Sequence, residues 1–424
     1  MQPRHAIKRT RRARHARTAP RASVARALAI AACAVLAFGT GGVATAYLKL
    51  QSNIRGGDIE ALITTRPTIH TPDPEDESKG TPLNLVLIGS DDRSGENGSI
   101  GGYFGGMRSD TTILMHISAD RDRIELVSIP RDLMTDIPAC KMTNGKETVA
   151  AFAQFNESFA YGAMVGEDVE SAAACTVATV EQMTDVYIDG YFVVDFSGFI
   201  TMVDAIGGVE VCVEQEIYSP KANNLHLMPG RQELDGATAL DFARARIGKG
   251  LGDGSDIGRI KRQQQLLAQT VNKVLSKNLL TQQVDLYRFL DAATRSLAAD
   301  EEFASIPTLA GLAYSLRSIK GANITFMTPK LATYPEDRNR VIWADGVNEI
   351  WTKIARDEPL KEPKGTKGPK PSTDDGGPSG SPDASADPSP DAPASSDAPT
   401  PDETDEPEVD DGSLTPDDVA GLCG

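Results

Sequence analysis

Short apolar runs bordered by charged residues constrain the fold of this chain more than any other feature of its sequence. Leu83–Ile88, Thr111–Ile117 and Ile124–Ile129 each have the length and composition of a buried strand. Longer patterns follow them, with apolar residues spaced three or four positions apart as in amphipathic helices. Strands that alternate with helices predict an α/β protein: a three-layer α/β/α domain with a central mixed sheet, spanning residues 81–356.

The same patterns predict the remaining elements of this domain. Further strands are expected at Tyr187–Val194, Val209–Val213 and Ile324–Met327. Helices are expected at Thr148–Gly162, Glu167–Met183, Asp195–Ile206, Ala237–Ala245, Arg259–Lys277, Gln282–Ala299 and Ile306–Ser318.

The N-terminal region has the composition of a membrane anchor. Residues 1–26 carry nine Lys or Arg and no acid, and residues 27–48 are twenty-two residues without a charge. A helix of that length reaches about 33 Å, enough to cross a bilayer core. The basic segment would stay in the cytoplasm, which places everything after Lys49 outside in a single-pass protein of the cell membrane. A cleaved signal peptide ending near Ala44-Thr45-Ala46 is the alternative, but the apolar run exceeds the ~7–15 residues of a typical one. A nucleic-acid-binding arm would leave that run unexplained.

Two segments outside the domain have compositions that disfavour a packed core. Residues 49–80 are turn-rich near their end and are expected to form an extracytoplasmic stalk. Residues 357–424 are rich in Pro, Ser, Ala and Asp, and their composition predicts a disordered tail. Residues 371–424 hold fifteen acidic residues and no Lys or Arg, so the net charge of −17 is mostly a property of this tail.

Five cysteines are present, and three of them fall in the predicted domain. Cys33 lies in the predicted span and Cys423 in the tail, which leaves Cys140, Cys175 and Cys212. Thiols outside the cytoplasm tend to oxidise, so one disulfide is expected. Three pairings are possible; Cys140–Cys175 is preferred because Cys212 falls in a predicted strand. Unpaired, buried thiols are the alternative.

Arg and Asp residues recur where the predicted strands end. They are Asp91, Asp92 and Arg93 after the first run, Arg108 and Asp110 before the second, Arg131 and Asp132 after the third, and Arg244, Arg246, Asp256, Arg259 and Arg262 farther along. The ends of strands are where α/β sheets place their chemistry. Several guanidinium groups with a few carboxylates suit a polyanion, and phosphate with a divalent cation fits best.

Each of these residues also has a purely structural interpretation. Asp91 and Asp110 could share a Mg²⁺ ion across neighbouring strands, but either could be an ordinary strand-end residue. Arg131 follows Pro130 and could pair at the surface with Asp132 instead of binding a ligand. Asp256, Arg259 and Arg262 could form a salt-bridged helix face. His116 lies within a predicted strand and is expected in the core. No Cys, His or Ser has the surroundings of a nucleophile, which favours direct transfer over a covalent intermediate.

The combination of these motifs is far more specific than any one of them. The blocks Asn84–Arg93, Arg108–Thr111, Ser128–Asp132, Phe155–Gly162, Val193–Phe199, Val203–Glu210, Arg244–Arg246 and Asp256–Gln263 closely resemble, in order, those of the LytR-CpsA-Psr family. The resemblance covers roughly residues 81–275. It implies a membrane-anchored enzyme that moves a glycopolymer from a polyprenyl-pyrophosphate carrier onto peptidoglycan. The product would be a phosphodiester at the C6 hydroxyl of N-acetylmuramic acid.

The resemblance also assigns roles to individual residues. It implies that Asp91 and Asp110 hold Mg²⁺ (or Mn²⁺), although Asp92 stands beside Asp91 and could replace it. It implies that the pyrophosphate is bound by Arg93, Arg131, Arg244 and Arg246, with Arg259 and Arg262 as further candidates. Asp110, Arg93 and Arg131 form the expected catalytic set, in which Asp110 could also accept the hydroxyl proton. The prenyl chain would lie in an apolar tunnel, for which helices 195–206 and 259–277 are candidate walls.

Two other functions fit the same residues. A pyrophosphatase would act on the same lipid with water in place of the sugar hydroxyl, and a scaffold would hold lipid or polymer without turnover. The sequence does not distinguish wall teichoic acid, teichuronic acid, arabinogalactan and capsule as the polymer. Nucleic acid is not an expected partner behind a membrane anchor.

Overall fold

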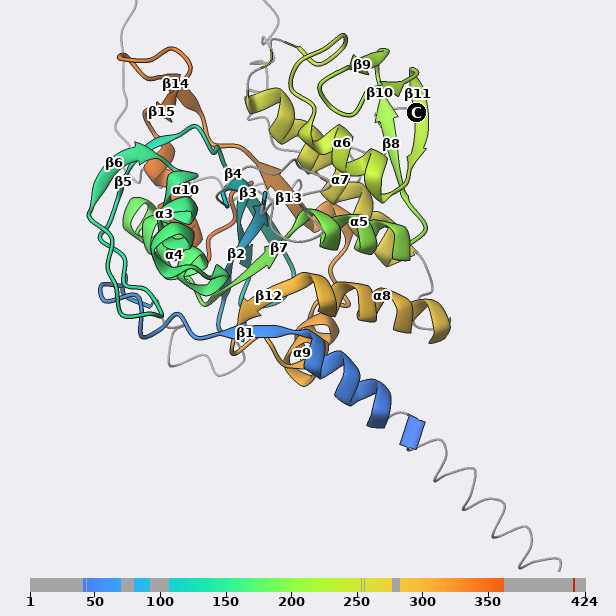
Figure 1. Cartoon of the computed structure of the whole chain (residues 1–424), viewed down its shortest axis with the longest axis horizontal. Coiled ribbons are helices and arrows are strands. Elements are labelled where there is room, and N and C mark those ends of the chain that lie inside the picture. The colour runs from blue at the N-terminus through green and yellow to red at the C-terminus, as the bar shows by residue number, and fades with distance from the viewer. Residues whose placement is uncertain are drawn as a thin grey trace, which may run out of the picture.

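A seven-stranded mixed sheet forms the centre of the molecule (Figure 1). The computed structural model describes residues 41–42, 44–69, 80–91, 107–252, 254, 256–276, 283–361 and 415. The sheet strands are β1 (Arg55–Gly57), β2 (Leu83–Ser90), β3 (Ser109–Ile117), β4 (Ile124–Ile129), β7 (Gly190–Val194), β12 (Leu297–Asp300) and β13 (Ile324–Met327), in the order β1-β12-β7-β2-β3-β4-β13. β2, β3 and β4 are antiparallel neighbours, whereas β7 runs parallel to β2 and β13 parallel to β4.

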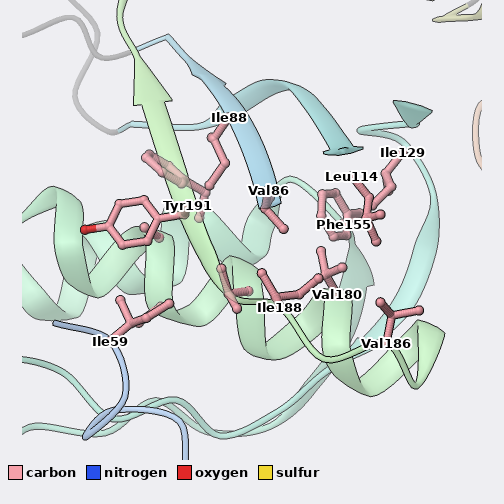
Figure 2. Packing of buried hydrophobic residues seen from close by; sticks show 14 of the residues in the cluster. Ile59, Val86, Ile88, Leu114, Ile129, Phe155, Val180, Val186, Ile188 and Tyr191 are labelled. Atoms are coloured by element: carbon pink, nitrogen blue, oxygen red, sulfur yellow. The ribbon is translucent and has the colours of Figure 1, made fainter. Parts of the chain in front are cut away.

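Helices cover both faces of this sheet, because its central strands are apolar on both sides. One face packs against α3 (Glu157–Gly166), α4 (Val169–Thr184) and α10 (Val347–Ala355) through a core that includes Val86, Leu114 and Phe159. Figure 2 shows Val86 and Leu114 directed into this core near Phe155 and Val180, and Ile88 beside Tyr191. The opposite face, with Leu85 and Ile113, packs against α7 (Asp256–Ser276) and α9 (Ile306–Ser315).

A second cluster of elements lies beside the sheet and has a hydrophobic core of its own. It contains α5 (Phe196–Ala205), α6 (Gly236–Arg244), β8 (Val209–Val213), β9 (Ile217–Ser219), β10 (Leu225–Leu227) and β11 (Gly230–Leu234), with α8 (Gln283–Ser296) packed on α5. Asp195 and Asp235 begin the two shorter helices: their carboxylates accept the N–H of Gly198 and Thr238 at 2.7 and 2.8 Å. Two hairpins complete the structure: β5 (Met134–Ile137) with β6 (Ala151–Gln154), and β14 (Leu331–Thr333) with β15 (Val341–Trp343).

Most predicted elements are confirmed, with two corrections. The predicted helix at Thr148–Gly162 is wrong in its first half, where β6 pairs with β5 and the helix begins only at Glu157. The predicted helix at Gln282–Ala299 ends at Ser296, and β12 follows it. In both places pairing with another strand overrides a local preference for helix that comes from Ala-rich sequence. His116 is fully buried, as expected.

The domain extends beyond the predicted boundaries at both ends. Residues 55–63, assigned from the sequence to a stalk, contain β1 of the central sheet and the buried Ile59 and Ile63. Asp357, assigned to the tail, accepts from the N–H of Ala119 at 3.0 Å and lies 3.0 Å from Nε2 of His116. Most of the predicted span at residues 27–48 and of the predicted tail lies outside the described residues. Within the described ranges, no helix is both long and apolar enough to cross a membrane.

The preferred disulfide is confirmed. Cys140 and Cys175 are bonded, with Cα atoms 5.3 Å apart, and the bond joins the loop after β5 to the middle of α4.

Candidate active site

Three strand ends that carry charged residues meet at one end of the central sheet. β3 is antiparallel to both neighbours, so its first residues lie beside the last residues of β2 and β4. Asp91 follows β2, Asp110 is the second residue of β3, and Arg131 comes after β4 and Pro130. The backbone of Asp91 donates to the carbonyl of Arg108 at 2.9 Å, and its Oδ1 accepts from the N–H of Arg108 at 2.6 Å. Asp91 is therefore fixed against the start of β3.

A cavity of about 490 Å³ opens between these strand ends. It is lined by Asp91, Arg108, Asp110, Arg131, Asp132, Gln154, Asn156, Glu157, Arg246, Asn339 and Arg340. All of these side chains are polar and four are arginines, which suits a phosphorylated ligand. Another cavity, of about 360 Å³, is lined largely by Asp and Glu with Arg66, which does not suit an anion.

Arg131 contacts three carboxylates from different parts of the chain. Its Nη1 donates to Oδ1 of Asp110 at 2.5 Å, and its Nε lies 3.5 Å from Asp132 and 3.8 Å from Asp256. Burial alone would lower the pKa of Arg131, but the neighbouring Asp110 and Asp132 raise it. The guanidinium therefore keeps its charge although it is mostly buried.

Three guanidinium groups lie around the carboxylate of Asp132 at the cavity wall. Its carboxylate lies 3.5 Å from Nε of Arg131, 3.4 Å from Nη2 of Arg246 and 3.7 Å from Nη1 of Arg340. Burial raises the pKa of Asp132, while Arg131, Arg259 and Arg340 oppose that shift. One carboxylate thus holds together arginines from the end of β4, the segment after α6 and the loop before β15.

A buried ion pair lies beneath Asp110. Nη2 of Arg259 is 2.6 Å from Oδ1 of Asp256, and the two side chains are only 3 % and 8 % exposed. The same Nη2 donates to the carbonyl of Asp110 at 2.9 Å. Burial raises the pKa of Asp256 and lowers that of Arg259, while their mutual attraction opposes both shifts. Arg259 therefore supports the site from below and is not among the residues that line the cavity.

The structure brings only part of the predicted set to the cavity. Asp91, Asp110, Arg131 and Arg246 line it. Arg244 and Arg262, like Arg259, do not line the cavity and point to protein groups. The Arg244 guanidinium lies 4.3 Å from the centre of the Phe196 ring. Arg262 donates to the carbonyls of Phe242, at 3.3 Å, and Ala245, which end α6. Burial, with Arg259 nearby, lowers the pKa of Arg262 to about 10. Arg93 and Asp92 lie outside the described residues.

Sequence reasoning did not assign Arg340 to the site. Arg340 reaches the cavity because the N–H of Val341 donates to the carbonyl of Asp132 at 3.3 Å, which docks the β14–β15 hairpin onto the end of β4. Its local sequence, Asp337-Arg-Asn-Arg340, carries no signal of a site. Arg108 does carry such a signal, since it lies just before the predicted strand Thr111–Ile117. Its Nη2 lies 3.1 Å from Oε1 of Glu157 at the cavity wall.

The carboxylates at the cavity fit a divalent cation that binds together with phosphate. Asp91 and Asp110 line the same space, and hard carboxylate oxygens are what Mg²⁺ prefers. In the part of the chain that the structure describes, no group of three or more His, Cys, Asp or Glu side chains is arranged to hold a metal alone. The fit is therefore to an ion that takes its other ligands from phosphate and water.

Comparison with known proteins decides the family. Residues 47–354 match the LytR_cpsA_psr family. The chain belongs to the LytR-CpsA-Psr family. The resemblance predicted from the sequence motifs is thereby confirmed, and the matched residues include every described element from β1 to α10 except the last residue of that helix.

Two relatives of this LytR-CpsA-Psr protein carry names from cell-wall synthesis. It is 30 % identical over 262 residues to "Cell wall biosynthesis protein LcpA" of Corynebacterium glutamicum, across 58 % of this chain and 49 % of that protein. It is 32 % identical over 227 residues to "Polyisoprenyl-teichoic acid--peptidoglycan teichoic acid transferase TagU" of Bacillus cereus, across 53 % of this chain and 64 % of that protein. Each match therefore spans less than two thirds of the relative's own length.

Among solved structures, the "LytR-Csp2A-Psr enzyme from Actinomyces oris" aligns with a TM-score of 0.49 at 19 % identity, over 71 % of this chain and 96 % of that one.

Proposed function

We propose that this protein transfers a glycopolymer from a polyprenyl-pyrophosphate carrier to the C6 hydroxyl of N-acetylmuramic acid in peptidoglycan. The observation that carries the proposal is the set of arginines around Asp132 in a polar cavity that also holds Asp91 and Asp110. Membership of the LytR-CpsA-Psr family supports it, as does the similarity to a protein named a teichoic acid transferase.

The proposed reaction displaces prenyl phosphate from the phosphorus that carries the glycan. The acceptor hydroxyl oxygen forms a new P–O bond while the bond to the leaving phosphate breaks, and the hydroxyl proton passes to a carboxylate. Charge on the phosphoryl oxygens is stabilised by arginines that are already in place, of which Arg131, Arg246 and Arg340 line the cavity. Asp110 is held by Arg131 through one oxygen, and we assign the proton to this carboxylate.

Mg²⁺ or Mn²⁺ is part of the proposal. Asp91 and Asp110 would hold it, and a bound ion would neutralise charge on the pyrophosphate. We expect chelation of divalent ions to abolish transfer, and added Mg²⁺ or Mn²⁺ to restore it.

One assay separates transfer from its two rivals. The full chain in detergent is incubated with Mg²⁺, a prenyl-pyrophosphate glycan and peptidoglycan oligomers, and the products are analysed by mass spectrometry. Glycan linked to the oligomer through a phosphodiester supports transfer. Free phosphorylated glycan alone supports a pyrophosphatase, and tight binding without product supports a scaffold.

Arg131→Ala provides the decisive variant. Loss of a preorganised charge at a phosphoryl centre predicts a fall of at least about a hundredfold in the transfer rate. Arg231→Ala is the matched control, because Arg231 pairs with Glu210 at the surface, where both side chains are more than half exposed. Wild-type rates for Arg131→Ala would contradict the assignment.

The same assay distinguishes the roles of the remaining arginines. We expect Arg246→Ala to weaken donor binding, since Arg246 lines the cavity. We expect Arg262→Ala to act mainly through stability, since its guanidinium is bound to the end of α6. Arg93 and Arg244 remain donor-binding predictions from the family resemblance.

We also propose a single-pass membrane topology with the N-terminus in the cytoplasm. Nine basic residues before twenty-two uncharged ones support it. Protease added to intact spheroplasts should digest the domain and spare the basic segment; full protection of the domain would refute the topology.

A further inference from the structure

Two aromatic side chains lie beside the arginine-rich cavity. The ring of Phe152 in β6 and the ring of Tyr334, directly after β14, have centroids 6.1 Å apart at an interplanar angle of 52°. Phe152 is 53 % exposed, and neither residue belongs to a hydrophobic core cluster of the described chain. Single exposed apolar residues are common, but this pair is assembled from segments about 180 residues apart in sequence.

Both rings stand on backbone that continues into the cavity wall. Phe152 is two residues before Gln154 in the same strand, so the two side chains share a face about 7 Å apart. The N–H of Tyr334 donates to the carbonyl of Arg340 at 3.0 Å. Gln154 and Arg340 both line the cavity, as does Asn339. The aromatic pair therefore extends the rim of the cavity outward on the side formed by the two hairpins.

We propose that Phe152 and Tyr334 bind a sugar ring of the acceptor glycan, beside the hydroxyl that attacks. This inference rests on the proposed transfer function. The face of an aromatic ring is electron-rich, and the C–H groups on one face of a pyranose are attracted to it. Gln154 and Asn339 lie next to the rings and offer amide donors and acceptors for sugar hydroxyls. The hydroxyl of Tyr334 donates a hydrogen bond to Glu336, which raises the pKa of that tyrosine.

The acceptor suits this surface better than the pyrophosphate or the prenyl chain of the donor, and the donor glycan is the rival that the kinetic test separates. The pyrophosphate of the donor matches the charge of the arginines, whereas a neutral sugar ring is better matched by the face of an aromatic ring. A prenyl chain needs a long, enclosed apolar surface, and two rings on an open rim do not supply one. The acceptor is a large polymer that must approach through solvent, so its contact surface must be exposed.

The test compares acceptor and donor kinetics of ring-deletion variants. Phe152→Ala and Tyr334→Ala are assayed in the full chain with detergent, Mg²⁺, the lipid-pyrophosphate glycan and soluble peptidoglycan oligosaccharides. Each is expected to raise the acceptor KM about three- to tenfold, with the donor KM and kcat unchanged. Tyr334→Phe keeps the ring and should retain most of the acceptor affinity. Tyr314→Ala is the matched control: Tyr314 is an exposed aromatic residue on α9, at 66 %.

The outcomes separate this inference from the proposed function. Transfer with an unchanged acceptor KM in both Ala variants overturns the inference, and so does a rise in the donor KM alone, because the rings would then serve the donor glycan. Absence of transfer by the wild-type chain counts against the proposed function. In that case calorimetry with the same oligosaccharides still decides: weaker binding by Phe152→Ala than by Tyr314→Ala supports the aromatic site, and equal binding overturns it.

Discussion

The buried Asp256–Arg259 pair provides the sharpest test of how this site is held together. Replacement of Arg259 by Met keeps much of the side-chain volume but removes the charge that lies 2.6 Å from Asp256. Asp256 is then left with Arg131, whose Nε is 3.8 Å away. Removal of one partner from a buried pair typically costs about 3–5 kcal/mol, because the other charge stays desolvated. The carbonyl of Asp110 also loses its donor.

A second substitution separates this effect from lost packing. Asp256→Asn removes the stranded charge, so in the Arg259→Met background it should restore about 2 kcal/mol. Lower pH should also restore stability to the Arg259→Met variant. Burial already raises the pKa of Asp256, and loss of Arg259 raises it further, so protonation relieves the variant as pH falls. The stability difference between wild type and Arg259→Met should therefore shrink between pH 7 and pH 5.

The assay is urea unfolding of the two single variants, the double variant and wild type, followed by circular dichroism at both pH values. The reasoning would be refuted if the loss of unfolding free energy in the double variant equalled the sum of the losses in the two single variants within about 0.5 kcal/mol. A stability difference that does not change with pH would do so as well.

Three further predictions concern the rest of the domain. Burial raises the pKa of Asp189 to about 6, above its usual 3.8, so its contribution to stability is full below pH 4 and lost as pH rises through 6. Between pH 4.5 and 7 this should lower the free energy of unfolding of the wild type by roughly 2 kcal/mol. Asp189→Asn should remove that fall, measured as the urea midpoint across this pH range; an unchanged pH profile would contradict this. Loss of the Cys140–Cys175 bond, which closes a 35-residue separation, should lower stability by about 3–4 kcal/mol, measured as the urea midpoint of the double variant Cys140→Ala/Cys175→Ala against wild type; an unchanged midpoint would contradict this. Gly162→Ala would place a Cβ 2.4 Å from the carbonyl oxygen of Ser171, where α3 crosses α4, so the melting temperature should fall by several degrees. Gly311→Ala, within α9 and with open space around its Cβ, should not lower it.

The sequence was sufficient to predict the part of the site that strand ends determine. Apolar runs located β2, β3 and β4, and their antiparallel order brings Asp91, Asp110 and Arg131 together. The family resemblance added Arg246. Local sequence patterns do not predict where this side chain lies, because it follows the end of a helix. What could not be predicted depends on long-range pairing: β12 is Leu-Ala-Ala-Asp, a strand only because β1 and β7 flank it. Arg340 reaches the site in the same way, through a hairpin that docks on β4.

The N-terminal segment joins the central sheet at the same level as the candidate site. Arg55 at the start of β1 is aligned with Ala298, Val193 and Ile88 on successive strands, and Ile88 is three residues before Asp91. Three strand spacings amount to about 15 Å, and residues 44–53 form a helix directly before this point (Figure 1). If this segment anchors the chain, the candidate site lies close to the anchor. Under the proposed membrane topology, a lipid-linked donor could then reach the cavity by diffusing within the bilayer, so supply of donor becomes a search in two dimensions at high effective concentration. The polymeric acceptor alone would have to arrive from outside.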